Sequence, residues 1–372
     1  MKINFLKSDL EECLKIVSHS LPGNKTSAVI LNSILVEAIK NKITITSTDS
    51  EKSIITEVIG EVKEEGRAAI NGTYLLSIVS NLPDENIDLE INNKKEAVIK
   101  WKTGNQKFST KDPDVYPRVK VEKNKENEIV VSEYILKKLI DKTVFVCDKN
   151  SSVITARGIC LEINGDNIVS KAVSNNAYAI YNKKLKEKYP KKEVIIPGES
   201  IEELGKIIEG NVDKDVIINI EKEKVIFKFS NFTFISNIIN GDFVNTDKIR
   251  SLEYTTRIVV NKKDLVNSLN RIRVISNELE NKSFLLTSTG NNIKISSTSI
   301  LGEGNEDIEV KKTGNDISIM FICSTVLTVL NKIDEEKINI YFTTSEAPCV
   351  IKDDKETYTY YVSSVKGPKK RS

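Results

Sequence analysis

The residues whose type and spacing suggest chemistry are lysines and arginines in and beside predicted helices. The chemistry that they suggest is contact with phosphate. In the helices expected from Ser132 and from Lys262, basic residues fall outside the apolar stripe that must pack. Alone, each set is better explained as an ordinary solvated helix face. If equivalent surfaces recur in a repeated unit, the charges form one sequence-independent, salt-sensitive site for nucleic acid. The expected contact residues are Lys25, Lys137, Lys138, Lys142, Lys149, Arg271 and Arg273.

Catalytic, metal and cofactor motifs are missing from the sequence. His19 is the single histidine, so a His-x-x-His metal pair is impossible, and its place favours a helix C-terminal residue. The five cysteines are scattered without a C-x-x-C pair, which predicts neither zinc nor disulfides. The stretch 302–307 lacks the third glycine of a dinucleotide fingerprint and predicts a loop, and 334–336 predicts a solvated helix end. We expect no catalytic residue, no metal and no cofactor.

Composition bounds the class of protein. The 372 residues carry 55 Lys and Arg against 53 Asp and Glu, so any basic surface must be local. At roughly 150 residues per domain, this length gives two to three domains. The N-terminal residues carry charges where a signal peptide needs apolar ones, and no apolar run approaches the roughly 18 residues of a membrane span. We therefore expect a cytoplasmic protein without a membrane contact.

An internal repeat organises the chain. Three β-rich runs, each leading into a helix-like apolar pattern, contain Ile70, Ile196 and Ile322, which are spaced 126 residues apart. A second set of strand–helix junctions precedes them, with helices expected after residues 3–5, 129–131 and 258–260. Alternating apolar residues, as in 216–220 and 338–342, indicate antiparallel sheets with one solvated face.

These patterns predict an α+β fold of three tandem copies of one unit, each with two helices and several strands. Polar stretches near 121–126 and 247–251 mark the boundaries. We expect domains at residues 1–126, 127–250 and 251–372.

Several stretches, in this order and spacing, resemble the bacterial sliding clamp, the β subunit of DNA polymerase III. The resemblance covers essentially the whole chain, and the stretches that carry it are residues 28–35, 44–51, 108–110 with 114–117, 157–162, 240–243, 274–278 and 321–327.

The resemblance implies a function without chemistry. A clamp is a head-to-tail homodimer that closes into a ring of six similar domains, with helices lining a hole that holds duplex DNA and sheets outside. It is a non-catalytic processivity factor of DNA replication, because it tethers DNA polymerase III and raises the effective concentration of the enzyme at its template. The implied partners are double-stranded DNA, DNA polymerase III, the clamp loader and other clamp-binding proteins.

The resemblance also implies two protein–protein sites. The dimer interface is expected at Lys107, Phe108 and Thr110 of the first domain and Val274 and Ile275 of the third, with Glu303, Glu306 and Asp307 adding complementary charge. A groove for partner peptides is expected between the second and third domains. Its lining would be Val173, Tyr178, Val244, Ile249, Thr325, Pro348, Tyr361, Val362 and Val365.

The groove departs from the family pattern. The usual Thr-Asp-Gly-His-Arg-Leu reads Val-Ser-Asn-Asn-Ala-Tyr at 173–178, Phe-Pro-x-Tyr reads Phe-Val-Asn-Thr at 243–246, and Met-Pro-Met-Arg reads Ser-Ser-Val-Lys at 363–366. A basic stretch, 367–372, follows. The alternative is therefore a divergent clamp paralog that serves repair or mobile-element partners instead of the replicative polymerase. An α+β enzyme unrelated to clamps is a third, weaker hypothesis.

Overall fold

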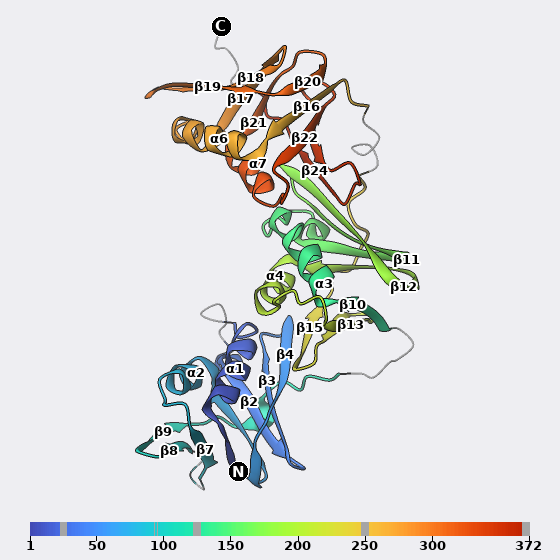
Figure 1. The fold of residues 1–372 in the computed structure, drawn as a ribbon. Helices are drawn as coiled ribbons and strands as arrows, with labels where there is room; N and C mark the ends of the chain where they lie inside the picture. Colours follow the sequence, from blue (N-terminus) through green and yellow to red (C-terminus); the bar gives the residue numbers. More distant parts are fainter. Residues whose placement is uncertain (23–27, 93, 95, 122–127, 247–252, 367–372) are drawn as a thin grey trace. The chain divides into compact units, whose positions relative to one another are not determined.

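The computed structural model describes residues 1–22, 28–92, 94, 96–121, 128–246 and 253–366 (Figure 1). Most of the two predicted boundary stretches, together with Lys25, Ile249 and the basic stretch 367–372, lies outside these residues. The described helices are α1 (Lys7–Ser18), α2 (Gly72–Ser80), α3 (Glu133–Asp141), α4 (Gly198–Ile207), α6 (Lys262–Ser276) and α7 (Cys323–Leu330).

Strands alternate with these helices along the chain. In the N-terminal part they are β1 (Lys2–Leu6), β2 (Ser33–Ile39), β3 (Lys42–Thr48), β4 (Lys52–Val58), β5 (Glu61–Glu64), β6 (Gly66–Asn71), β7 (Asn86–Ile91), β8 (Glu96–Trp101) and β9 (Gly104–Ser109). In the middle they are β10 (Glu128–Ser132), β11 (Gly158–Val173), β12 (Ala177–Pro197), β13 (Asp215–Ile220), β14 (Lys224–Lys228) and β15 (Phe232–Asn237). In the C-terminal part they are β16 (Thr256–Asn261), β17 (Ser283–Thr289), β18 (Asn292–Ser299), β19 (Gly302–Glu309), β20 (Lys311–Gly314), β21 (Ser318–Ile322), β22 (Lys337–Phe342), β23 (Cys349–Lys352) and β24 (Tyr358–Val362).

The chain forms two compact units, and the middle repeat is divided between them. One unit comprises residues 1–137 and 199–238, and the other comprises residues 138–198 and 239–372. The first holds sheets in the order β5-β1-β7-β8-β9 and β10-β13-β14-β15-β4-β3-β2-β6. The second holds β11-β12-β24-β23-β22-β16-β20 and β19-β18-β17-β21. The strand pairs described within these sheets are antiparallel.

The predicted repeat is confirmed by the element order. β6, β12 and β21 pass directly into α2, α4 and α7, and β1, β10 and β16 pass directly into α1, α3 and α6. Each repeat therefore starts two helices from the end of a strand. Within the units, α1 packs on α2 and α6 packs on α7. Figure 1 shows α6 and α7 together beside the sheet of β17, β18 and β21.

Apolar spacing and caps explain why these helices form. In α1, Leu10, Cys13, Leu14 and Val17 are buried, which is one face of a helix. The side chain of Asn261 accepts hydrogen bonds from two backbone N–H groups in the first turn of α6 and so satisfies donors that would otherwise lack partners. Asn71 caps α2 in the same way, whereas α1 and α7 have no side-chain cap.

One prediction about this part of the chain is wrong. Residues 302–307, expected to form a loop, lie in β19, which pairs with β18 from Ser299–Gly302 to Asn292–Glu309. The glycines and acidic residues hide the strand in the sequence because β19 is a sheet edge with few buried side chains.

Candidate functional site

The lysines of α3 are held by carbonyl and carboxylate oxygens. Lys137 is half-buried and its Nζ donates to the Gly205 carbonyl oxygen at 2.5 Å. Lys138 Nζ lies 3.1 Å from an Asp334 carboxylate oxygen. Lys142, just beyond α3, is 7% exposed, and its Nζ lies 2.9 Å from the same carboxylate and also donates to the Lys332 carbonyl oxygen. Of the three, Lys142 is therefore the least suited to meet DNA.

Asp334 follows α7 and binds both lysines. Burial alone would raise the pKa of this carboxyl, but hydrogen bonds from Lys142 and Lys138 outweigh it and lower the pKa. The carboxylate therefore stays ionised at neutral pH. The expected solvated helix end is thus an ion-paired carboxylate, with an Asp334 side chain that is still 70% exposed.

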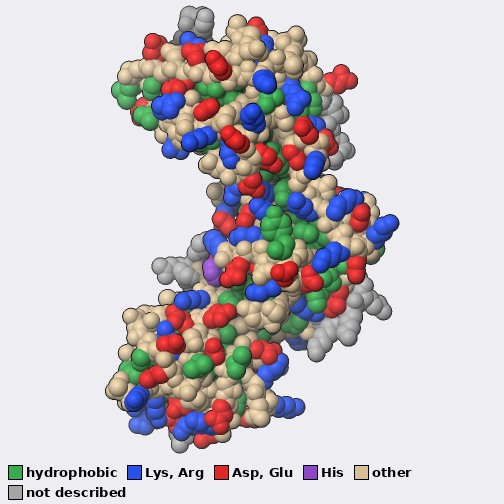
Figure 2. Space-filling model, in the orientation of Figure 1, with side chains coloured by type: hydrophobic (Ala, Val, Ile, Leu, Met, Phe, Trp, Pro, Cys, Tyr) green, Lys and Arg blue, Asp and Glu red, His purple; other side chains and the backbone are tan. Residues whose placement is uncertain are grey.

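The arginines of α6 are exposed. Arg271 forms a two-pronged ion pair with Glu306 of β19, at 2.7 and 2.6 Å. This geometry holds the guanidinium plane and lowers the pKa of the Glu306 carboxyl. Arg273, in the last turn of the helix, is exposed, as is Lys149. Figure 2 shows basic and acidic side chains interspersed over the face in view, in keeping with the balanced net charge.

An aromatic pair occupies the place predicted for the apolar groove. Tyr178 of β12 and Tyr361 of β24 are opposite each other in the sheet, and their rings stack 5.5 Å apart at 21°. They are only 2% and 5% exposed. Val173 and Phe243 pack against this pair, so three of the residues expected to line an open groove, Val173, Tyr178 and Tyr361, pack into one cluster.

The other predicted groove residues divide by burial. Val362 is fully buried in β24, whereas Val244, Thr325, Pro348 and Val365 are partly buried. The segment after β24 is held in place, because Ser363 N–H donates to the Asn176 carbonyl oxygen and Val365 N–H to that of Met320. Of the whole predicted set, Thr325 lines a cavity beside the tyrosine pair.

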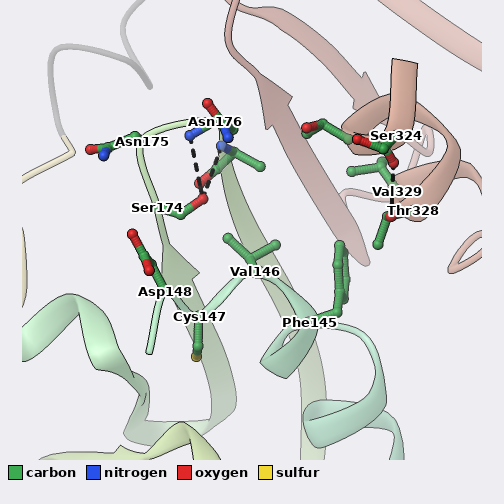
Figure 3. Close-up of a pocket in the computed structure, with 12 residues that line it drawn as sticks. Phe145, Val146, Cys147, Asp148, Ser174, Asn175, Asn176, Ser324, Thr328 and Val329 are labelled. Carbon is green, nitrogen blue, oxygen red and sulfur yellow. Dashed lines mark hydrogen bonds between the residues drawn. The ribbon is translucent and has the colours of Figure 1, made fainter. Parts of the chain in front are cut away.

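That cavity has a volume of about 360 Å³ and a mixed lining (Figure 3). Its apolar part comes from Phe145, Val146 and Val329. Its polar rim is the turn between β11 and β12, where the Ser174 hydroxyl accepts from the Asn176 N–H at 3.4 Å, together with Ser324 and Thr328 of α7. The predicted set omitted Phe145 and Val146, which sequence patterning could have placed on the short apolar run after α3.

The predicted interface residues lie on and beside two sheet edges. Lys107 and Phe108 belong to β9, the edge strand of its sheet, and Thr110 follows it. Phe108 meets Tyr74 of α2 edge to face at 5.7 Å, a contact that sequence reasoning missed. Val274, 71% exposed, is on α6. A Cβ on Gly304 of β19 would lie 2.7 Å from the Ile275 side chain, so Ile275 packs over this second edge strand.

Two further exposed apolar residues, Ile300 at 97% and Leu301 at 75%, form the turn into β19. They come directly before Gly302 in the sequence. Two adjacent apolar residues at an expected turn could have predicted this exposed apolar spot from the sequence.

Other side chains with reactive groups are either paired or buried. His19 Nδ1 lies 2.7 Å from Glu203. Burial raises the pKa of the Cys160 and Cys349 thiols to about 12. Among the described residues, no three His, Cys, Asp or Glu side chains are grouped to hold a metal ion, and none of the described helices is long and apolar enough to cross a membrane.

Family comparisons match this architecture along the chain. The models of the N-terminal, central and C-terminal domains of the DNA polymerase III beta subunit match residues 1–120, 130–245 and 252–365. The chain belongs to the DNA polymerase III beta subunit family. The three matches follow the order of the three repeats, so the chain is built of three tandem clamp domains.

Relatives and solved structures agree. The chain is 27% identical over 363 residues to the beta sliding clamp of Staphylococcus epidermidis, covering 95% of this chain and 94% of the relative. A candidate DNA polymerase III beta subunit from Eubacterium rectale is 30% identical, with a TM-score of 0.94 over 99% of this chain and 100% of that one. The sliding clamp of Bacillus subtilis is 25% identical, with a TM-score of 0.93 over the same shares.

Proposed function

We propose that this chain is a non-catalytic sliding clamp that encircles duplex DNA as a head-to-tail homodimeric ring and tethers DNA polymerase III and other partners during replication. The family supports the function, and one feature of the sheets supports the ring. In each compact unit, a sheet continues from one repeat into the next, and among the described strands β9 and β19 are sheet edges, paired on one side only.

The two internal junctions follow one rule. The last strand of the second repeat, β15, pairs with β4 of the first, and the last strand of the third, β24, pairs with β12 of the second. By the same rule β9, the last strand of the first repeat, needs a strand equivalent to β4 and β12. That strand is β19 of the third repeat. Both β9 and β19 are sheet edges, so a second copy completes both.

The junctions also predict the register. Ile54 lies opposite Phe234, and Ala179 lies opposite Tyr360. Counting through the paired strands of each sheet, the equivalent positions in the open edges are Gln106 and Gly304. Lys107 then lies opposite Glu303 of the other copy, so basic and acidic side chains face each other across the new ladder.

For the DNA-facing surface we propose Arg273 and Lys149, whose side chains are exposed, together with Lys137 and Lys138. Lys138 shares the Asp334 carboxylate with Lys142, so its charge reaches DNA when that ion pair opens. Lys142 and Arg271 act mainly as structural ion pairs. Lys25 remains part of the prediction from sequence, outside the described residues.

The finer assignments remain our proposals. We keep domain limits at 1–126, 127–250 and 251–372, the cytoplasm as the compartment, and a partner-peptide site beside Tyr178 and Tyr361. The stacked tyrosines affect which peptide sequences fit that site. Their presence does not favour a role in repair or in a mobile element over a role in replication.

A loading experiment tests this function. The protein is assembled on nicked circular duplex DNA with a clamp loader and ATP, and the DNA is then linearised. We expect the mass of a dimer in solution, retention on the circle and loss from the linear molecule, because a ring slides off free ends. A monomeric mass together with equal retention on both DNA forms would refute the proposal.

A further inference from the structure

An open cavity of about 480 Å³ lies on the C-terminal repeat, and its lining shares no residue with the cavity beside the tyrosine pair. Leu285 of β17, Ser296 of β18 and Met320 of β21 are adjacent in the sheet, since Leu285 pairs with both others. Leu285 and Met320 are only partly buried. The lining includes Leu279, Glu280, Phe284, Leu285, Ser296 and Met320.

The N-terminal repeat has an equivalent place, and there an aromatic ring of the chain itself packs on the sheet. In that repeat Leu35 of β2 pairs with Thr46 of β3 and Ala69 of β6, as Leu285 pairs with Ser296 and Met320. Leu35 and Ala69 are buried, and the ring of Tyr116 packs on them. The Tyr116 hydroxyl donates to the Thr46 carbonyl oxygen at 3.4 Å. One aromatic side chain thus covers Leu35 and Ala69, and a cavity of about 450 Å³ remains beside its ring.

The segment that follows the last strand of each of these two repeats hydrogen-bonds to the sheet at the equivalent position. Lys111 N–H donates to the Ala69 carbonyl oxygen at 2.8 Å, and Val365 N–H donates to that of Met320 at 2.9 Å. Tyr116 comes five residues after Lys111, whereas the residue five positions after Val365 is Lys370. The C-terminal repeat therefore has the apolar seat for a ring but a cation at the position that would supply it.

We propose that this cavity is a docking site for an aromatic side chain of a partner protein, carried on an extended segment and followed by a cationic residue. The ring replaces Tyr116 of the N-terminal repeat, with the Met320 thioether against its edge or face. Glu280 is the one charged residue among those lining the cavity, so it favours a following Lys or Arg. In the N-terminal repeat, Arg118 follows Tyr116 in this way.

The two methionines of the chain make a direct test, because Met320 lines the cavity and Met1 does not. The full chain is labelled with ¹³C-methyl methionine and titrated with a nonapeptide of the sequence of residues 112–120, Asp-Pro-Asp-Val-Tyr-Pro-Arg-Val-Lys. We expect a saturable ring-current shift of the Met320 methyl resonance, upfield where the methyl lies over the ring face and downfield where it lies at the edge, and no shift of Met1. A peptide with Ala for Tyr loses most of the buried area and should bind about tenfold or more weakly.

Variants separate docking from folding. Leu285→Gln and Ser296→Lys change partly exposed positions of the cavity and should weaken the peptide-induced shift at least as much as the Ala peptide does. Ile39→Gln, an equally strand-borne apolar residue of the other unit that is 43% exposed, should leave it unchanged. Circular dichroism verifies that each variant is folded.

Four results would overturn the proposal. The first is no movement of Met320, and the second is an equal shift with the Ala peptide. The third is a shift on raising the protein concentration without peptide, which assigns the cavity to a second copy. The fourth is a shift on removing residues 367–372, which assigns it to the chain itself. The peptide titrations, run at one fixed protein concentration, do not depend on ring closure around DNA, so their failure and the failure of the proposed function are distinguishable.

Discussion

Reversing one charge on β9 should open the ring. In the register derived from the internal junctions, Lys107 faces Glu303 of the other copy, so Lys107→Glu replaces an opposite-charge pair by a like-charge pair. An exposed pair contributes about 0.2–1 kcal/mol and a like-charge pair opposes by a similar amount. The change is therefore about 0.4–2 kcal/mol per interface. A dimeric ring has two interfaces, so the dissociation constant should rise roughly 4- to 700-fold.

Sedimentation velocity over a dilution series measures this constant, and the second charge reversal tests the register. Glu303→Lys alone should weaken the dimer similarly, and the double variant should recover to within a few-fold of the original. Lys311→Glu, an exposed strand lysine of the C-terminal repeat, is the matched control and should have little effect. If the double variant dissociates as readily as the sum of the single changes predicts, Lys107 and Glu303 do not face each other and the repeat argument fails.

Three other changes test the remaining sites. Tyr178→Leu restores the usual family residue and removes one ring of the stack, so a peptide with the common clamp-binding motif should bind more tightly by isothermal titration calorimetry. Unchanged peptide affinity would mean that the tyrosine pair does not limit access of the peptide to its site. Asp334→Asn removes the carboxylate that holds two lysines, so duplex DNA should bind a few-fold more tightly, with a steeper salt dependence by about one charge. The pKa of Asp334 is lowered in the folded state, so its ion pairs are present above the ordinary carboxyl range and are lost as pH falls through the folded pKa. Acidification should then raise DNA affinity less in the Asn variant than in the original. Burial raises the thiol pKa of Cys160 and Cys349 to about 12, so mass spectrometry at pH 8 should find iodoacetamide on the half-buried Cys147 first. Prior modification of Cys160 would contradict this.

The repeat was predictable from the sequence because its signals are local. A strand that ends at a helix start leaves a short pattern of alternating and then helically spaced apolar residues. Three such patterns spaced 126 residues apart needed no knowledge of distant contacts. The junctions after Asn71, Pro197 and Ile322 accordingly lie where the pattern placed them.

The contacts of the candidate site residues were not predictable from the sequence, because they join residues that are far apart in the chain. Lys138 meets Asp334 across 196 residues, and Arg271 meets Glu306 across 35. Helical patterning identifies which side chains leave the packed face, but it cannot show which carboxylate then faces them. The stacking of Tyr178 on Tyr361 has the same origin, since only the pairing of β12 with β24 brings the rings together.

Charge on the open strands explains why copies of this chain would join head to tail. An unpaired strand edge can pair with any other edge, including its own copy. β19 carries Glu303, Glu306, Asp307 and Glu309, so two β19 strands side by side would bring acidic residues together. β9 carries Lys107 and no acidic residue, so it suits β19 and cannot offer another β9 an opposite charge. The same acidic residues that hid β19 in the sequence thus select its partner.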